Sequence, residues 1–272
     1  MSSHSARIGP HTVGSGHPLL LVGGPCVIES RDHCLRLAAA ISSAARRFEL
    51  PFVFKASFDK ANRSSVSSFR GPGLEEGLSV LADVRREIGV PVLSDVHEAA
   101  QAAAAGEVLD CVQIPAFLCR QTDLLLACAQ TGRCVNIKKG QFLAPEKMQL
   151  AAEKVRTAGN ANVLLTDRGS FFGYERLVND LTGLSVMRQF APVIFDATHS
   201  VQQPGSAGSV TGGERRHIPL LSRAAIAAGV DGLFLEIHDD PPRAKSDAAT
   251  VWPLDQLDAL LGECVRVRAA VT

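Results

Sequence analysis

The sequence predicts an α/β fold in which eight strand–helix units close into a (β/α)8 TIM barrel, as a single catalytic domain over residues 1–272. Short runs of Val, Ile, Leu and Phe alternate with longer amphipathic stretches rich in Ala and Leu. The length of 272 residues is close to the roughly 250 residues typical of such barrels. A doubly wound open sheet shows the same alternation and is the alternative. Eight units favour the closed barrel.

The strands are predicted from eight short apolar runs. Nearly continuous apolarity, without polar alternation, is typical of strands that are buried on both faces of a parallel sheet. Polar or small residues follow each run, as expected where a buried strand ends at the surface. The predicted strands are Leu19–Ile28, Phe52–Phe58, Pro91–Val96, Cys111–Pro115, Cys134–Lys138, Val163–Asp167, Val193–Ala197 and Gly232–Ile237.

The helices are predicted from the amphipathic stretches between these runs. Glycines directly after several of the stretches indicate helix C-termini, because glycine readily adopts the left-handed conformation found there. Before the first strand, the stretch Ile8–Gly16 is expected to form a short hairpin that closes the barrel bottom. The predicted helices are Asp32–Arg47, Leu74–Ile88, Ala99–Ala105, Asp123–Thr131, Pro145–Ala158, Arg215–Ala228 and Leu254–Ala269.

Composition excludes several classes of protein. The formal net charge is zero, so no overall field favours nucleic acid or an anionic membrane. No apolar run reaches the roughly 18 to 20 residues needed to span a bilayer, and the polar start, residues 1–16, lacks the layout of a signal peptide. Seven cysteines without a Cys-x-x-Cys pair indicate a reducing compartment. We therefore expect a cytoplasmic protein without nucleic-acid or membrane partners.

Charged residues follow nearly every predicted strand, and in a parallel barrel these positions share one rim, where barrel active sites form. Cations that converge there repel one another unless anions neutralise them. Two groups of residues suggest two phosphorylated substrates or one bisphosphate. The alternative is a solvated basic loop balanced by Asp59 and Glu75. The inner group comprises Lys60, Lys138 and Arg168 and the outer group Asn62, Arg63 and Ser64, with Lys55 at the same rim.

A thiol, an imidazole and two carboxylates follow strands that adjoin where the barrel closes: Cys26, His199, Glu236 and Asp247. This donor set suits a divalent transition ion, Fe2+, Zn2+, Mn2+ or Co2+. Each member also has an ordinary alternative role. Cys26 can be a packed thiol, Glu236 can pair with a lysine of the barrel mouth, and Asp247 can cap a local turn.

Several motifs together resemble the 3-deoxy-D-manno-octulosonate 8-phosphate synthases, over almost the whole chain. The most specific is the loop Lys55–Ser65 with its Lys-Ala-Asn-Arg-Ser sequence. The related 3-deoxy-D-arabino-heptulosonate 7-phosphate synthases typically have Lys-Pro-Arg-Thr-Ser in that loop, so the difference favours arabinose 5-phosphate over erythrose 4-phosphate. Other motifs are Ser94–Glu98, Gln113–Asp123, Asn136–Phe142, Thr166–Gly169, Phe195–His199 and Glu236–His238. Asp239 departs from the family pattern, in which proline usually follows the histidine.

The resemblance implies condensation of phosphoenolpyruvate with D-arabinose 5-phosphate and water, for lipopolysaccharide biosynthesis, by a homotetramer. It implies the metal-dependent branch, since Cys26 replaces an asparagine of the metal-free branch. It places Phe117 and Arg120 around the sugar phosphate of a neighbouring subunit. Separately, the loop Gln202–Gly213 is rich in glycine and small residues, a composition that indicates a mobile lid over the site. The implied phosphoenolpyruvate contacts are Lys55, Ser57, Lys60, Gln113, Ala116, Lys138 and Arg168; the sugar contacts are Asn62, Arg63, Ser64 and Asp95; the catalytic residues are Asn62, Asp95, Lys138, His199 and Asp247; and the metal ligands are Cys26, His199, Glu236 and Asp247.

Two other mechanisms or functions stay open at this point. A Schiff-base aldolase would use Lys138 or Lys139 as its nucleophile. A sugar-phosphate-binding barrel without catalysis is the second alternative, acting as a sensor or scaffold.

Overall fold

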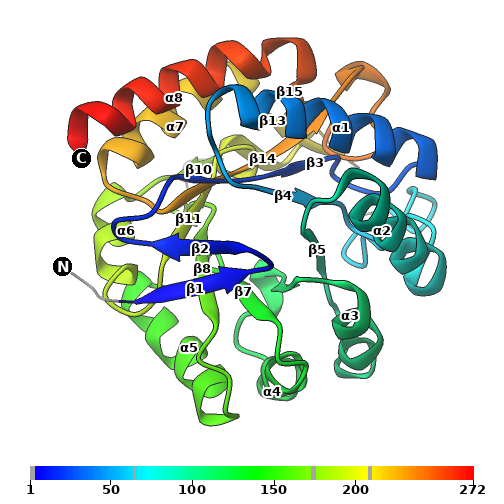
Figure 1. The fold of residues 1–272 in the computed structure, drawn as a ribbon, viewed down its shortest axis with the longest axis vertical. Helices are drawn as coiled ribbons and strands as arrows, with labels where there is room; N and C mark the ends of the chain where they lie inside the picture. Colours follow the sequence, from blue (N-terminus) through cyan, green and yellow to red (C-terminus); the bar gives the residue numbers. More distant parts are fainter. Residues whose placement is uncertain (1–3, 64, 173–175, 208–209) are drawn as a thin grey trace.

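A computed structural model describes residues 4–63, 65–172, 176–207 and 210–272. Eight parallel strands form a closed barrel surrounded by helices (Figure 1). Neighbouring strands follow the chain order, and pairing of the last strand with both the first and the seventh closes the ring. The barrel prediction is therefore confirmed, and the open sheet is excluded. The barrel strands are β3 (Leu20–Gly24), β4 (Phe52–Lys55), β5 (Val92–Asp95), β6 (Cys111–Ile114), β7 (Cys134–Lys138), β8 (Val163–Asp167), β11 (Val193–Asp196) and β14 (Gly232–His238).

The helices cover the outside of the barrel. The predicted helices are confirmed within a few residues, except that four of them begin with a 3-10 turn before the α-helix. The helix Leu181–Met187 was not predicted; it is only seven residues long and contains Gly183. Its N-terminus is nevertheless capped by the Asp180 side chain, which accepts from Thr182 N. The α-helices are α1 (Arg31–Arg47), α2 (Leu74–Ile88), α3 (Ala102–Val108), α4 (Thr122–Gln130), α5 (Met148–Thr157), α6 (Leu181–Met187), α7 (Ile218–Ala227) and α8 (Leu257–Val271).

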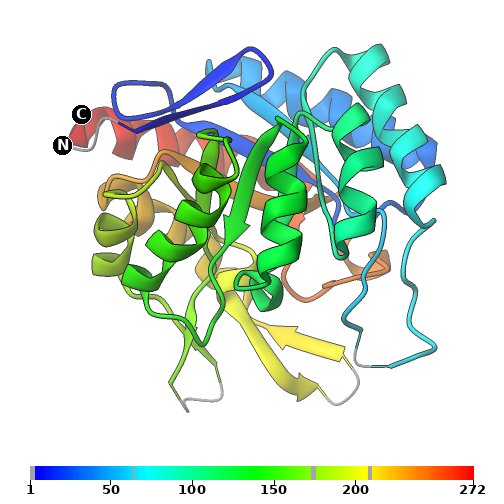
Figure 2. The ribbon, with the colours of Figure 1, turned by 90° about the horizontal axis from the view of Figure 1, so that it is seen from below.

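The remaining elements are short. Two antiparallel hairpins lie at opposite ends of the barrel, one at the N-terminus and one after β11 (Figure 2). The short strands are β1 (Ser5–Ile8), β2 (His11–Gly14), β9 (Ser170–Phe171), β10 (Leu177–Val178), β12 (Gln202–Ala207), β13 (Val210–Gly213) and β15 (Trp252–Pro253). The 3-10 turns are η1 (Ala99–Gln101), η2 (Ala116–Leu118), η3 (Pro145–Lys147), η4 (His199–Val201), η5 (Arg215–His217), η6 (Pro241–Arg243) and η7 (Leu254–Gln256).

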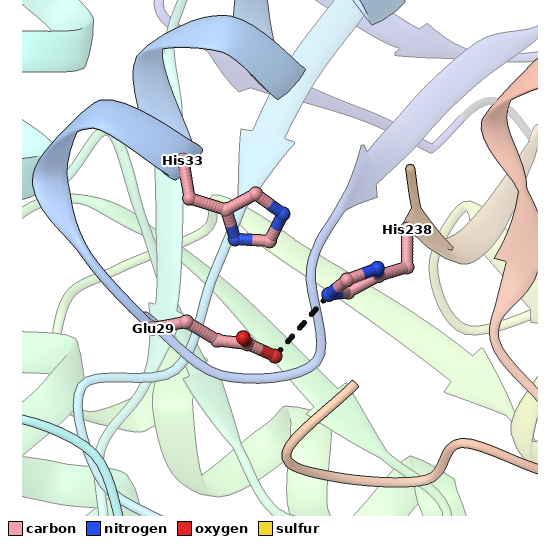
Figure 3. A group of neighbouring side chains, drawn as sticks. All are labelled: Glu29, His33 and His238. Atoms are coloured by element: carbon pink, nitrogen blue, oxygen red, sulfur yellow. Dashed lines mark hydrogen bonds and ion pairs between the residues drawn. The ribbon is translucent and has the colours of Figure 1, made fainter. Parts of the chain in front are cut away.

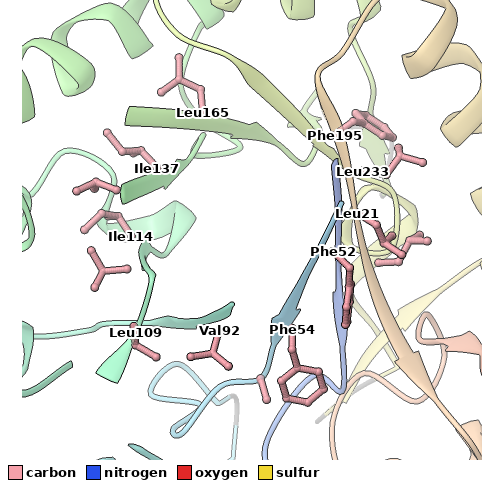
Figure 4. Packing of buried hydrophobic residues seen from close by; sticks show 14 of the residues in the cluster. Leu21, Phe52, Phe54, Val92, Leu109, Ile114, Ile137, Leu165, Phe195 and Leu233 are labelled. Carbon is pink, nitrogen blue, oxygen red and sulfur yellow. The ribbon is translucent and has the colours of Figure 1, made fainter. Parts of the chain in front are cut away.

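Side chains alternate between the two faces of each barrel strand, and this alternation divides the core. Outward residues such as Leu21, Phe54 and Phe195 belong to the large cluster that packs between strands and helices (Figure 4). A second cluster holds the inward residues of the lower barrel together with Ala6, Ile8 and Val13 of the N-terminal hairpin. The hairpin therefore closes the barrel bottom, as predicted, with apolar side chains.

The same alternation places polar side chains at the upper end of the barrel. In β4, Val53 belongs to the lower inner cluster, and Lys55 is the next inward residue. In β11, Ile194 and Asp196 have the same relation. Two residues of strand therefore separate an apolar floor from a charged layer above it, because successive inward positions are about 7 Å apart along the strand axis.

Candidate active site

A cavity of about 970 Å³ opens at the carboxyl ends of the barrel strands. Most of the residues that the sequence predicted for the site contribute to its wall. Cys26, Ser57 and Glu236 are buried side chains that contact wall residues. Arg120 lies apart, at a separate hollow of about 400 Å³ beside Lys147 and Lys154, and Ser64 is outside the described residues. The predicted residues that line the cavity are Lys55, Lys60, Asn62, Arg63, Asp95, Gln113, Ala116, Phe117, Lys138, Arg168, His199 and Asp247.

Two lysines of the barrel mouth are neutralised by carboxylates of the protein. Lys55 Nζ lies 2.9 Å from Glu236 Oε1, and Lys138 Nζ lies 2.5 Å from Asp196 Oδ2. All four side chains are buried. The alternative that Glu236 pairs with a lysine of the barrel mouth is therefore confirmed, and buried ion pairs balance these two lysines before any substrate anion binds.

Asp196 belongs to the buried charged network beside the cavity, and the sequence analysis did not select it. Its carboxylate pairs with Lys138 and also lies 2.7 Å from His199 Nδ1. Burial by itself raises the pKa of Asp196, but His199 and Lys138 outweigh burial and hold this pKa well below its usual range. Asp196 therefore stays ionised and fixes the orientation of both neighbours. Its position at the carboxyl end of β11 was the signal that would have identified it.

Arg168, a cation of the inner group, has unused hydrogen-bonding capacity. Its Nη2 donates to Gln202 Oε1, whereas Nη1 is buried without a hydrogen-bond partner. Burial lowers the pKa of Arg168, and the carboxylates of Asp196 and Asp247 act in the opposite direction. A buried guanidinium nitrogen without a partner is costly, so its place in the cavity wall indicates an anionic ligand.

The outer group lies on the loop between β4 and α2. Arg63 donates to the carbonyl oxygens of Phe69 at 2.9 Å and Lys245 at 3.1 Å, which fixes the loop against the segment that carries Asp247. Asn62 is exposed beside it on the cavity wall. The alternative of a freely solvated basic loop is therefore not supported for Arg63.

Asp95 lies between a serine and a histidine. Ser57 Oγ donates to Asp95 Oδ1, and His97 Nε2 lies 3.0 Å from Asp95 Oδ2. Burial by itself raises the pKa of Asp95, but His97 and Lys60 outweigh burial and hold this pKa well below its usual value. Asp95 is thus an ionised acceptor in the cavity wall, and His97, which the sequence analysis did not select, orients it.

The predicted metal ligands come together at the edge of the cavity. One ligand atom each of Cys26, Glu236 and Asp247 lies within 4.8 Å of the others. His199 Nε2 is 3.6 Å from Glu236 Oε2 and 3.6 Å from Asp247 Oδ2. Glu236 Oε2 is buried and has no hydrogen-bond partner. This oxygen faces the gap between the four side chains, so the donor set fits a divalent transition ion.

Two local features support this fit. Asp247 has a positive φ of 50°, a conformation that is uncommon for residues other than glycine and that concentrates at functional sites. Burial, and then the charge of Glu236, raise the pKa of the Cys26 thiol well above its usual value in the metal-free protein. A bound divalent ion reverses that preference, since a coordinating thiol is deprotonated.

The second lysine of the Lys138–Lys139 pair faces away from this chemistry. Lys139 Nζ contacts Asp167 Oδ1 at 3.3 Å and Ser170 Oγ at 3.0 Å, and Lys139 is absent from the cavity wall. Lys138 lines the cavity with its Nζ 4.0 Å from the centre of the Phe234 ring. Of Lys138 and Lys139, only Lys138 is placed to contact a substrate in the cavity.

The stretch predicted as a lid forms the hairpin β12–β13, with residues 208–209 outside the described part of the chain. It was expected as a loop, whereas its first and last residues pair in register, Gln202 with Gly213 and Gln203 with Gly212. Pro204 and Gly212 line the cavity, and Gln202 accepts from Arg168. The hairpin therefore stands over the mouth and contacts the inner cation group.

Comparison with known proteins decides the family. The sequence profile described as the DAHP synthetase I family matches residues 4–270. The chain belongs to this family. A 2-dehydro-3-deoxyphosphooctonate aldolase of Koribacter versatilis is 60% identical over 261 residues, which are 94% of each chain. Proteins with the same name from Cyanothece sp. and Desulfotalea psychrophila are 54% and 55% identical, over 96% of each chain in the first case and over 95% of this chain and 93% of the relative in the second.

The name of these relatives is a synonym of 3-deoxy-D-manno-octulosonate 8-phosphate synthase, so the predicted resemblance is confirmed. These relatives are carbon–carbon bond-forming enzymes, which is the class that the sequence predicted. Among the residues that the structure describes, no helix is both long and apolar enough to cross a membrane.

Proposed function

We propose that the chain condenses phosphoenolpyruvate with D-arabinose 5-phosphate and water, giving 3-deoxy-D-manno-octulosonate 8-phosphate and inorganic phosphate for lipopolysaccharide biosynthesis. The observation that carries the proposal is that the cavity wall holds two separate groups of side chains that can each bind an anion. Arg168 Nη1, without a partner, belongs to the inner group, and Asn62 and Arg63 belong to the outer one. Two positions match the two phosphate groups of the substrates.

The inner position is proposed for phosphoenolpyruvate. Lys138 and Arg168 are buried and Lys60 has only 13% of its side chain exposed, so their positive charge is poorly screened by water and stabilises the phosphate and carboxylate strongly. Lys55, Ser57, Gln113 and Ala116 complete its surroundings. Since Lys55 and Lys138 each have a buried carboxylate partner, their positions are fixed before the substrate arrives.

The outer position is proposed for the sugar phosphate. Asn62, Arg63 and Ser64 would bind the phosphate group, and the ionised Asp95 would accept from sugar hydroxyls. Phe117 has 52% of its surface exposed, and Arg120, three residues further along the chain, is also exposed. These exposed side chains support a homotetramer in which Phe117 and Arg120 help enclose the phosphate of a neighbouring subunit.

The reaction needs positioning and charge more than a covalent intermediate. The C3 carbon of phosphoenolpyruvate bonds to the aldehyde carbon of the sugar, water adds at C2, and cleavage of the C2–O bond releases phosphate. The buried cations hold the anionic groups throughout. Asn62, Asp95, Lys138, His199 and Asp247 are the proposed catalytic residues, and Asp196 holds His199 and Lys138 in place.

Cys26, His199, Glu236 and Asp247 are proposed to hold one divalent ion, Fe2+, Zn2+, Mn2+ or Co2+. When bound, such an ion polarises an oxygen of water or of the aldehyde. The whole chain, residues 1–272, is proposed to be one catalytic domain. The seven cysteines are all buried thiols, which supports a cytoplasmic location.

A phosphate-release assay with the two candidate sugars tests the substrate. We expect arabinose 5-phosphate to be turned over at least about 100-fold more efficiently than erythrose 4-phosphate, which corresponds to about 2.7 kcal/mol of transition-state stabilisation. Equal or better turnover of erythrose 4-phosphate would assign the chain to the heptulosonate synthases instead. No phosphate release with either sugar and several metals would support a binding protein.

Chelation tests the metal. Removing divalent ions is expected to abolish phosphate release, and adding Mn2+ or Co2+ is expected to restore it. The Cys26→Ala variant should lose about 100-fold or more in metal affinity, because it removes one of four ligands. Cys128→Ala, which alters another buried thiol on α4, is the control and should retain both properties. Full activity after exhaustive chelation would contradict the metal proposal.

Borohydride trapping tests the remaining alternative mechanism. A Schiff base on Lys138 would be reduced to a stable adduct in the presence of substrate. We expect no adduct, because Lys138 is held 2.5 Å from Asp196 as a cation in a buried pair. A covalent adduct at Lys138, identified by mass spectrometry, would replace the proposed mechanism.

A further inference from the structure

Two histidines and one carboxylate form a second cluster outside the cavity (Figure 3). One ligand atom each of Glu29, His33 and His238 lies within 4.8 Å of the others. Glu29 follows the Cys26 segment, His33 is in the first turn of α1, and His238 ends β14. Asp239 adjoins them and lies 3.0 Å from His33 Nε2. None of these residues lines the cavity or takes part in the proposed reaction.

The decisive observation is a nitrogen without a partner. His33 is only 6% exposed, and its Nδ1 atom is buried without a hydrogen-bond partner. Because Nε2 donates to Asp239, Nδ1 is the nitrogen that carries a lone pair. A buried lone pair without a donor or a cation is costly, and in native proteins such groups usually have a partner. In this structure, the carboxylate of Glu29 and the ring of His238 lie beside it.

The hydrogen bonds of His33 match those of a histidine that binds metal. A metal-ligating histidine usually donates its other ring nitrogen to a carboxylate, as His33 Nε2 does to Asp239. His238 Nε2 faces Glu29 Oε1 at 3.3 Å, and His238 Nδ1 faces Asp239 Oδ1 at the same distance of 3.3 Å. In this structure His238 Nδ1 accepts from Asp240 N at 2.9 Å, so Nε2 carries the ring proton. Binding of an ion at Nε2 requires the other tautomer, in which the Nδ1 proton faces Asp239 Oδ1 and the hydrogen bond from Asp240 N is lost.

Access and charge also suit a cation. Asp239 has 39% of its side chain exposed, so the cluster is reached from solvent, whereas the side chains of His33 and His238 are only 8% and 6% exposed. Two carboxylates outweigh the nearest cation, Arg36, whose Nη2 is 4.0 Å from Asp239 Oδ2. Two imidazoles with one or two carboxylates form a donor set typical of Zn2+.

We propose that Glu29, His33 and His238 form a second site for a divalent transition ion, of the Zn2+ class, with Asp239 as the carboxylate that orients His33. The site joins α1, the end of β14 and the loop before Asp247, since Glu29 Oε1 also accepts from Lys245 N at 2.8 Å.

Metal content per chain tests the proposal. The full-length protein is stripped with a chelator, saturated with Zn2+, exchanged into metal-free buffer and measured by mass spectrometry. We expect His33→Leu to bind about one ion fewer than the wild type. His17→Leu, which removes an exposed histidine elsewhere, is the control for adventitious binding and should match the wild type. An unchanged metal content in His33→Leu would overturn the proposal.

Two further variants keep the test decisive. Asp239→Asn changes an exposed side chain and is expected to weaken Zn2+ binding at this site by about 10- to 100-fold, measured by calorimetry in the Cys26→Ala background. Unaltered affinity in that variant would overturn the proposal even if His33→Leu failed to fold. The same measurement distinguishes failure of this proposal from failure of the proposed catalytic metal site. If only the catalytic site were wrong, Cys26→Ala would bind as many ions as the wild type, whereas His33→Leu would still bind one fewer.

Discussion

Replacing Asp196 with asparagine is expected to lower the free energy of unfolding by about 3–5 kcal/mol, because it leaves Lys138 buried without its counter-charge. Asp196 is fully buried, and its carboxylate contacts both Lys138 and His199. Burial already lowers the pKa of Lys138, and Asp196 opposes that effect. Without Asp196, we expect the pKa of Lys138 to fall further and phosphate release to decrease by about 100-fold or more. Urea denaturation and the phosphate-release assay measure the two effects.

A matched control separates the effect of losing a buried ion pair from the effect of losing an exposed one. Asp258 pairs with Arg47 at 2.6 Å, but both side chains are about half exposed. The Asp258→Asn variant should therefore change the free energy of unfolding by no more than about 1 kcal/mol and leave turnover intact. If Asp196→Asn destabilised the protein no more than this control, the claim that the buried Lys138–Asp196 pair stabilises the fold would be wrong.

Replacing Arg168 with lysine is expected to raise the KM for phosphoenolpyruvate by about 10- to 100-fold, with a smaller effect on kcat. The change keeps the positive charge but removes the planar fork, and a charged hydrogen bond contributes about 1.5–3 kcal/mol. Arg168 offers Nη1 to the cavity while Nη2 holds Gln202 of the hairpin β12–β13. Initial-rate kinetics at saturating arabinose 5-phosphate separate KM from kcat.

Arg188→Lys is the corresponding control. Arg188 also makes a two-pronged contact, with Asp231 Oδ2 at 3.1 Å and Oδ1 at 2.8 Å, but it is absent from the cavity wall. This variant should lose stability without a change in the KM for phosphoenolpyruvate. An Arg168→Lys variant with a wild-type KM would show that the inner anion is held by the lysines alone.

The barrel was largely predictable from the sequence because its strands are buried on both faces. Such strands form continuous apolar runs, and β7 and β8 have the predicted bounds (Cys134–Lys138 and Val163–Asp167). The helix α6 was missed because seven residues around Gly183 give too little periodicity. The hairpin β12–β13 was missed because most of its residues are small or polar and show no apolar alternation. It is recognised only from the pairing of its two strands over the barrel mouth.

The sequence predicted where the residues of the candidate site lie, but it did not predict which of them form ion pairs with one another. Residues at strand ends were expected at one rim, and the cavity confirms that most of them share it. Which cation pairs with which anion did not follow, since Lys55 and Glu236 are separated by 181 residues. The selection of His199 without Asp196 shows the same limit, because the sequence does not reveal which strand-end carboxylate is buried between Lys138 and His199.

The sequence by itself determined the barrel, the rim that carries the chemistry, and the family, through the loop Lys55–Ser65 and the strand-end motifs. These features depend on local composition and on the fixed geometry of parallel strands, which any long apolar α/β pattern reveals. Only the tertiary structure decided that Asp196 anchors the charged layer, that Arg168 keeps a free nitrogen, and that His33 meets His238 and Glu29. The physical reason is that the energy of a buried charge or lone pair depends on neighbours that the fold brings from distant parts of the chain.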